Sequence, residues 1–166
     1  LQLTVTVLVL FIGLTISQFV SQRYSNTLTE AATAKAFNIA HNLALGAADA
    51  ILINDLVMLQ KELEDLIIST PSVAYIFVEK DGQVLAHTFA SGIPKGLIGI
   101  NRPQKIDNGN LQKIETRQDI RYLDVAWPIF NGHAGILRLG LSEAPYQKQV
   151  RQLWLQMSLI TLAILI

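Results

Sequence analysis

Two oppositely charged side chains, those of Asp124 and Arg138, stand in segments where apolar and polar residues alternate. Successive side chains of a β-strand point to opposite faces, so this alternation places both charges on the more polar face of a predicted sheet. An Asp/Arg couple there could line a pocket and orient an amine, carboxylate or hydroxyl group. The alternative is an ion pair on a partly exposed face, which stabilises a fold only slightly. Both interpretations are open.

Further candidate ligand contacts fall on the same face or near its edge. Alternation groups an aromatic pair on the first predicted strand with a tyrosine that precedes Asp124, and a histidine ends the second strand. A concave, partly apolar surface with a few polar groups is how small-molecule sites are built. The predicted ligand-binding residues are therefore Tyr75, Phe77, His87, Tyr122, Asp124 and Arg138.

Several classes of chemistry have no motif in this chain. It lacks a Walker loop, a dinucleotide-binding glycine fingerprint, a zinc-protease helix and a nucleophile elbow, so we predict no catalytic residue. His41, His87 and His133 are scattered and cysteine is absent, so we expect neither a metal site nor another cofactor. A net charge of zero argues against a nucleic-acid partner bound through a broad basic surface.

Two β-hairpins provide the strands for these residues. Val73–Lys80 and Gln83–Phe89 are joined through Asp81-Gly82, and Arg121–Phe130 and Ala134–Leu141 are joined around Asn131-Gly132. Asp-Gly and Asn-Gly are the strongest short-range hairpin signals. The glycine-rich stretch from Ser91 to Asn110 has no periodicity and is predicted to form a long loop over the sheet.

A long helix is predicted before the hairpins, over residues 21–70. Ser21 to Ile68 contains no proline, one glycine and many alanines, which favour helix, and Pro71 ends it. Leucines recur at heptad-like spacing along this segment, at Leu45, Leu52, Leu56, Leu59, Leu63 and Leu66. This stripe could pair with its mate in a homodimer or lie on the sheet, and both interpretations are open. Together with the sheet over residues 71–142, the helix predicts a one-domain α+β fold.

The two ends of the chain are apolar. Leu1–Val20 carries no charge over a length that matches the hydrocarbon core of a bilayer, so we predict a first transmembrane helix. Residues 143–166 are predicted to contain a linker and the start of a second transmembrane helix, with the charge-free run Leu153–Ile166. We therefore expect a membrane-held domain that is a piece of a longer protein.

The order of these segments resembles a known family. A long alanine-rich helix with Ile53-Asn54-Asp55 precedes the run PSVAYIFVEKDGQVLAHTF from Pro71 to Phe89. Pro128-Ile129-Phe130 and the run GILRLGLS from Gly135 to Ser142 follow. Over nearly its whole length the chain is similar to the extracytoplasmic PAS-like (single Cache, or PDC) sensor domains of bacterial sensor histidine kinases. The resemblance implies a periplasmic domain at the inner membrane, a parallel homodimer through the long helices, and a small-molecule pocket on the sheet face away from them.

The ligand implied by the resemblance differs from that of the citrate and C4-dicarboxylate sensors. His87 matches their carboxylate-binding histidine, but two arginines expected from them are Val84 and Asp124 here. Losing two cations and gaining an acid disfavours di- and tricarboxylates, and Asp124 would favour an amine or hydroxyl group. Alternative functions are the input domain of a chemoreceptor or diguanylate cyclase, and a dimerisation module that binds no ligand.

Overall fold

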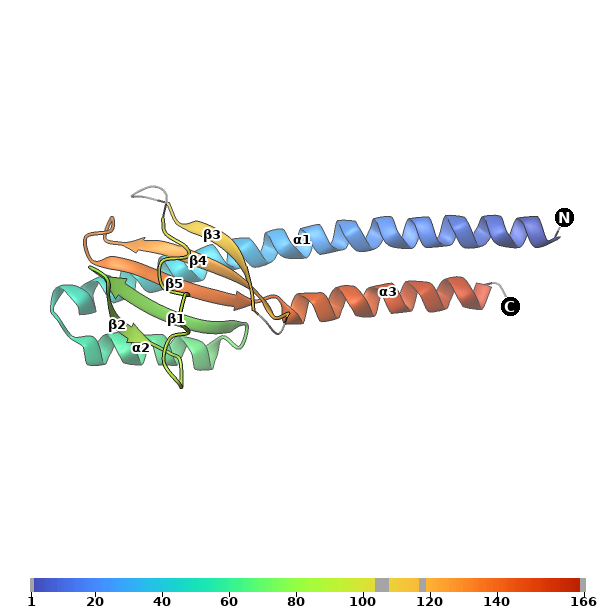
Figure 1. Ribbon diagram of the computed structural model, residues 1–166. Coiled ribbons are helices and arrows are strands. Elements are labelled where there is room, and N and C mark those ends of the chain that lie inside the picture. Colours follow the sequence, from blue (N-terminus) through green and yellow to red (C-terminus); the bar gives the residue numbers. More distant parts are fainter. Residues whose placement is uncertain (1, 104–107, 117–118, 165–166) are drawn as a thin grey trace. The chain divides into compact units, whose positions relative to one another are not determined.

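The computed structural model describes residues 2–103, 108–116 and 119–164, which form an α+β structure (Figure 1). The helices are α1, Gln2–Leu52, α2, Leu56–Ser69, and α3, Ala144–Ile164. The strands are β1, Val73–Lys80, β2, Gln83–His87, β3, Asn110–Glu115, β4, Arg121–Ile129, and β5, Gly135–Ser142. The chain divides into two compact units, one of Leu1–Ala31 with Ala144–Ile166 and one of Ala32–Glu143.

The five strands of the second unit form one antiparallel sheet in the order β2-β1-β5-β4-β3. Both predicted hairpins are confirmed. Positive φ angles at Asp81 and Gly82, and at Asn131 and Gly132, explain why these residue types occupy the turns. β1 and β5, which come from different hairpins, pair at the centre of the sheet and so join the two hairpins.

Strand β3 is an element that the sequence analysis did not specify. It follows the glycine-rich loop and pairs along its whole length with β4, from Asn110 opposite Ala126 to Glu115 opposite Arg121. Its side chains are mostly half-buried or exposed, as is usual at an edge, and it lacks a continuous apolar run. The composition of such a strand resembles that of a loop, which is why alternation alone does not identify it.

The predicted continuous helix over residues 21–70 is wrong at one place, because the chain turns between α1 and α2. Asn54 has a φ of 58°, in the left-handed region that asparagine tolerates better than most residues. Asp55 then caps α2, since its Oδ1 accepts a hydrogen bond from the backbone N–H of Met58 at 2.9 Å. The Asn-Asp pair is the sequence signal for this break. The high helix propensity of the residues on both sides outweighed that signal in the sequence analysis.

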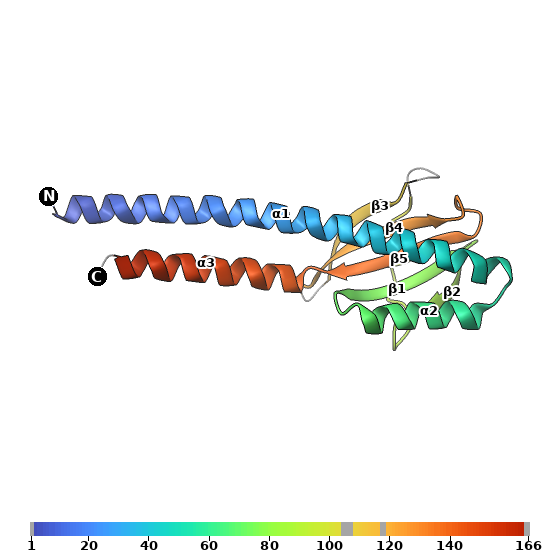
Figure 2. The same ribbon diagram turned by 180° about the vertical axis from the view of Figure 1, so that it is seen from behind.

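The part of α1 from Ala32 onward and the whole of α2 cover one face of the sheet (Figure 2). Small side chains let α1 approach closely, and its buried alanines within this unit are Ala32, Ala36, Ala40, Ala44, Ala47 and Ala50. Trp127 of β4 meets the rings of Phe37 and His41 on α1 at centroid distances of 6.0 and 5.1 Å. This confirms that the apolar sheet face containing Trp127 receives the helix.

The leucine stripe is divided by the turn between the two helices. Leu59 and Leu63 on α2 are fully buried, whereas Leu45 and Leu52 on α1 are 62% and 60% exposed. One part of the stripe therefore belongs to the core of the unit. The exposed part makes no continuous seam with it, because the helix does not continue through residues 53–55.

In the first unit, the beginning of α1 lies beside α3. A Cβ placed on Gly13 would come 2.7 Å from Cγ2 of Thr161, so a larger residue here would require the threonine side chain to shift. Large apolar side chains are exposed on both helices, among them Phe11, Phe19, Leu155, Leu159 and Ile160. Within the described residues, no helix meets the combined length and hydropathy required to cross a membrane.

Candidate functional site

The candidate site starts from two cross-strand rows on the sheet face opposite α1 and α2. Tyr75 on β1 pairs with Gly140 on β5, and Gly140 pairs in turn with Asp124 on β4. In the next row Phe77 pairs with Arg138. Directly opposed residues share a face, so the sheet register brings an aromatic, an acid and a base together, as alternation predicted.

Gly140 leaves room for Tyr75 to reach across the central strand. The ring of Tyr75 occupies the space that a side chain at residue 140 would need. Its hydroxyl donates a hydrogen bond to Oδ2 of Asp124 at 2.5 Å. A tyrosine on one strand is thus joined to an aspartate two strands away.

Asp124 and Arg138 form an ion pair that is fully buried, with no exposed side-chain surface on either partner. Nε of Arg138 donates to Oδ1 of Asp124 at 2.8 Å, and Nη2 lies 2.7 Å from the same oxygen but makes no well-aligned hydrogen bond. Nη1 donates to the carbonyl of Leu97, and the guanidinium lies 5.1 Å from the centre of the Phe77 ring. Of the two interpretations of the couple, the structure shows an ion pair, and a buried one.

Two asparagines that sequence reasoning missed complete this polar cluster. Nδ2 of Asn101, in the glycine-rich loop, donates to both the side chain and the main chain of Asp124 at 2.8 Å. Nδ2 of Asn110 donates to Oδ1 of Asn101 at 2.8 Å. A lone asparagine in a loop carries no sequence signal for this role, because its partners lie on distant strands. The loop is therefore fastened to the sheet through Asn101 and Leu97.

The buried cluster keeps Tyr75 in its neutral form. Burial is the larger cause of a strongly raised pKa for the Tyr75 hydroxyl, and the negative charge of Asp124 adds to it. A neutral hydroxyl remains a donor, which the carboxylate requires. Tyr75 is therefore a hydrogen-bond donor to Asp124 rather than an acid–base group near neutral pH.

A cavity of about 400 Å³ lies between this sheet face and the glycine-rich loop. Three aromatic residues contribute to its wall, and the Tyr75 ring stacks on Phe89 at 5.2 Å and meets Tyr122 edge-on at 5.7 Å. The described residues that line it are Tyr75, Phe89, Pro94, Lys95, Gly96, Leu97, Ile100, Ile114, Thr116 and Tyr122. Its volume lies within the range of small-molecule pockets.

The six predicted ligand residues fall into three groups by their position relative to the cavity. Tyr75 and Tyr122 line the cavity. Asp124, Arg138 and Phe77 are fully buried, and none of them is part of the lining. The carboxylate of Asp124 already accepts hydrogen bonds from three side chains, which leaves it little capacity for the ligand amine or hydroxyl that the sequence suggested.

His87, the last of the six, lies at the end of β2. Its ring centre lies 6.3 Å from that of Phe89, and its backbone N–H and carbonyl are bonded to the side-chain amide of Gln60 on α2. Nδ1 is buried without a hydrogen-bond partner among the described residues. His87 thus borders the aromatic group but is not part of the cavity lining.

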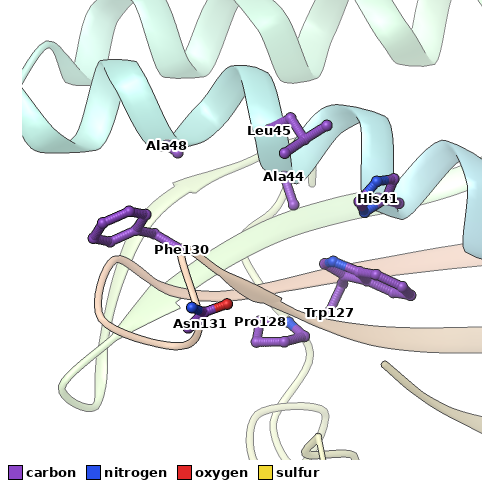
Figure 3. A pocket seen from close by; sticks show the side chains of 8 residues that line it. All are labelled: His41, Ala44, Leu45, Ala48, Trp127, Pro128, Phe130 and Asn131. Carbon is purple, nitrogen blue, oxygen red and sulfur yellow. The ribbon is translucent and has the colours of Figure 1, made fainter. Parts of the chain in front are cut away.

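A second cavity, of about 250 Å³, lies on the opposite side of the sheet (Figure 3). Helix α1 contributes His41, Ala44, Leu45 and Ala48, and the β4–β5 hairpin contributes Trp127, Pro128, Phe130 and Asn131. Its described lining includes two small alanines and no ionisable side chain apart from His41. The cavity provides a control position for experiments on the larger one.

Neither cavity adjoins a metal-binding cluster of described residues. Among the described residues, no group of three or more histidine and acidic side chains is placed to hold a metal ion. No protein-family model matches the chain, and no curated protein matches it significantly. A function is therefore inferred from the geometry of the site.

Proposed function

We propose that the Ala32–Glu143 unit is the small-molecule sensor domain of a membrane-anchored bacterial receptor, with the sensor histidine kinase as the receptor type. The observation that carries the proposal is the 400 Å³ cavity between the sheet and the loop. Concave, mostly apolar clefts with few polar groups are the usual form of ligand sites. The antiparallel sheet with helices on its other face agrees with the PAS-like resemblance.

The buried cluster beneath the cavity would make the site sensitive to its occupant. Arg138 holds the loop through the Leu97 carbonyl, and Leu97 itself lines the cavity. A ligand that pushes on Leu97 would thus act on a charged network that tolerates little displacement, because burial strengthens its interactions. A ligand biases signalling only through its different affinities for two such states.

The route to an output is short in sequence. Arg138 is on β5, which ends at Ser142, and α3 begins two residues later at Ala144. Glu143 between them donates its backbone N–H to the carbonyl of Arg121 on β4. A displacement of β5 would therefore pass directly into the helix that we expect to continue toward an output domain.

Membrane attachment and dimerisation belong to the same proposal. The uncharged sequence Leu1–Val20 and the exposed apolar side chains of α1 and α3 support an anchor in the inner membrane, with the sensor unit on the periplasmic side. The exposure of Leu45 and Leu52 supports a homodimer in which α1 of one copy lies against that of another.

The test is a thermal-shift screen of metabolites on the full 166-residue chain in detergent. A ligand of the larger cavity raises Tm of the wild type, and by linkage the shift grows with ligand concentration. Ile114→Trp and Thr116→Phe would fill that cavity, whereas Ala48→Met would fill the second one. We expect the ligand-induced shift to survive Ala48→Met and to be lost in both other variants.

Two results would contradict the sensor proposal. One is a broad panel in which no compound shifts Tm of the wild type. The other is a shift that persists in a folded Ile114→Trp or Thr116→Phe chain, with folding checked by circular dichroism. Two cavity-filling variants are used because either could disturb packing.

A further inference from the structure

We infer that the larger cavity takes a small aromatic acid, a flat ring carrying one carboxylate, with Lys95 as the residue that binds the carboxylate. This inference rests on the proposed function, since it names the ligand class of the same cavity. It follows from the shape of the walls and from which charges are still free to interact.

The walls of the cavity are suited to a flat apolar body. Tyr75, Phe89 and Tyr122 present rings in both stacked and edge-on arrangements, which are the two geometries in which aromatic groups attract one another. Aliphatic side chains also contribute to the lining, among them Leu97, Ile100 and Ile114. A ring inserted here would contact mainly apolar atoms on the side that faces the protein.

The charges beneath the cavity are already compensated. Asp124 and Arg138 are bound to one another, and neither reaches the lining. The Tyr75 hydroxyl donates its one hydrogen bond to Asp124 and therefore has none to donate to a ligand. The cluster shapes the floor of the site without supplying an ionic contact to a ligand.

Lys95 is the single formally charged side chain among the described lining residues. It is exposed, and no ion pair or hydrogen bond joins it to another described residue. No acidic side chain lines the described part of the cavity. The described lining therefore offers one cation and no anion, which favours a ligand with one negative charge over a cationic ligand.

The charges of the described lining also disfavour other classes of ligand. A di- or tricarboxylate would place its second charge against aromatic and aliphatic walls, where an unpaired charge is costly. An amino acid would bring an ammonium group, for which the described lining provides no carboxylate. An aromatic monocarboxylate satisfies both parts of the site, and the hydroxyls of Tyr122 and Thr116 can add hydrogen bonds to it.

The experiment is calorimetric titration of the full chain in detergent with three probes, phenylacetate, phenethylamine and succinate. Phenylacetate and phenethylamine are nearly equal in size and opposite in charge. We expect phenylacetate to bind at least about tenfold more tightly than either of the others, the factor that corresponds to one charge-assisted hydrogen bond. Equal affinities for phenylacetate and phenethylamine would overturn the inference.

Variants of Lys95 then assign the contact. Lys95→Met should weaken phenylacetate binding about tenfold, Lys95→Arg should restore most of the affinity, and Lys61→Met is the control because Lys61 is exposed on α2 outside the lining. Unchanged affinity in Lys95→Met would refute the assignment. If phenylacetate fails to bind while another compound shifts Tm through the cavity, the ligand class is wrong and the sensor proposal stands. If no compound binds, both fail.

Discussion

The ring of Tyr75 lies directly over Gly140, in the space where any other residue would carry its side chain. This relationship lets a β1 tyrosine bond to a β4 carboxylate across the central strand. It also makes a glycine in the middle of a strand necessary, although glycine there is otherwise unfavourable. The floor of the cavity depends on it.

Gly140→Ala should therefore destabilise the protein by about 1–3 kcal/mol, because the added methyl group displaces Tyr75 and weakens its bond to Asp124. Urea unfolding followed by tryptophan fluorescence measures this. Gly46→Ala is the matched control, since Gly46 is within α1 and an added Cβ meets its nearest atom at an ordinary 3.5 Å. That substitution should stabilise by about 0.5–1 kcal/mol. A neutral Gly140→Ala would show that the ring can move without cost.

The buried ion pair should show strong coupling in a double-mutant cycle. Asp124→Asn or Arg138→Met alone leaves one charge buried without its partner, which costs about 3–5 kcal/mol. The double variant should lose at least about 2 kcal/mol less than the sum of the two single losses. Urea unfolding of the four proteins gives this value.

An exposed ion pair in the same sheet is the control for that cycle. Arg121 and Glu115 approach to 3.1 Å, but each side chain is more than half exposed. Solvent screens such pairs, so Arg121→Met should have a far smaller effect than Arg138→Met. Additive losses at Asp124 and Arg138 would mean that the buried pair is not held as a unit.

Tyr75 should make the protein less stable in strongly alkaline solution. Its pKa is raised above the ordinary value of about 10, so the folded state holds the proton more tightly than the unfolded state. The resulting stabilisation is complete below pH of about 10 and is lost as pH rises toward the folded-state pKa. Tyr75→Phe should remove this dependence and lose about 1.5–3 kcal/mol at neutral pH with the bond to Asp124.

A spectroscopic measurement isolates the same group. Ultraviolet absorbance of the phenolate should show that one of the four tyrosines resists ionisation well above pH of about 10, and that this fraction disappears in Tyr75→Phe. Complete titration of the wild type near the ordinary pKa, without unfolding, would contradict the buried neutral hydroxyl.

Glu62 should give a second pH dependence, at acidic pH. Burial raises its pKa and the negative charge of Asp49 raises it further, and its Oε2 is buried without a hydrogen-bond partner among the described residues. The folded state therefore favours the protonated form. The stabilisation is present below the ordinary pKa of about 4.5 and is lost as pH rises through the raised value.

Glu62→Gln should consequently raise Tm at pH 7. It should also make Tm vary less between pH 4 and 7, because the ionisation of Glu62 no longer contributes to that variation. Asp65→Asn is the control, because Asp65 is exposed on the same helix. If Glu62→Gln lowers Tm at neutral pH, the ionised carboxylate has a favourable contact in the folded protein.

The sequence by itself determined the local elements and the two sheet faces. Asp81-Gly82 and Asn131-Gly132 specify the hairpins because they accept positive φ, and alternation placed Asp124 and Arg138 on one face. These are properties of neighbouring residues, so the sequence contains them directly. The turn at Asn54 and strand β3 were missed because helix propensity and edge polarity gave the opposite local signal.

Only the tertiary structure decided which polar groups are satisfied within the protein and which are available to the proposed ligand. Asp124 was the leading candidate from sequence, yet Tyr75, Asn101 and Arg138 from three other segments satisfy it. Lys95 had no sequence signal and enters the proposal because it lines the cavity with three aromatic residues and no ion pair joins it to another described residue. Hydrogen-bond partners are set by the sheet register and by loop closure, which bring distant residues together, so a pattern of neighbours does not reveal them.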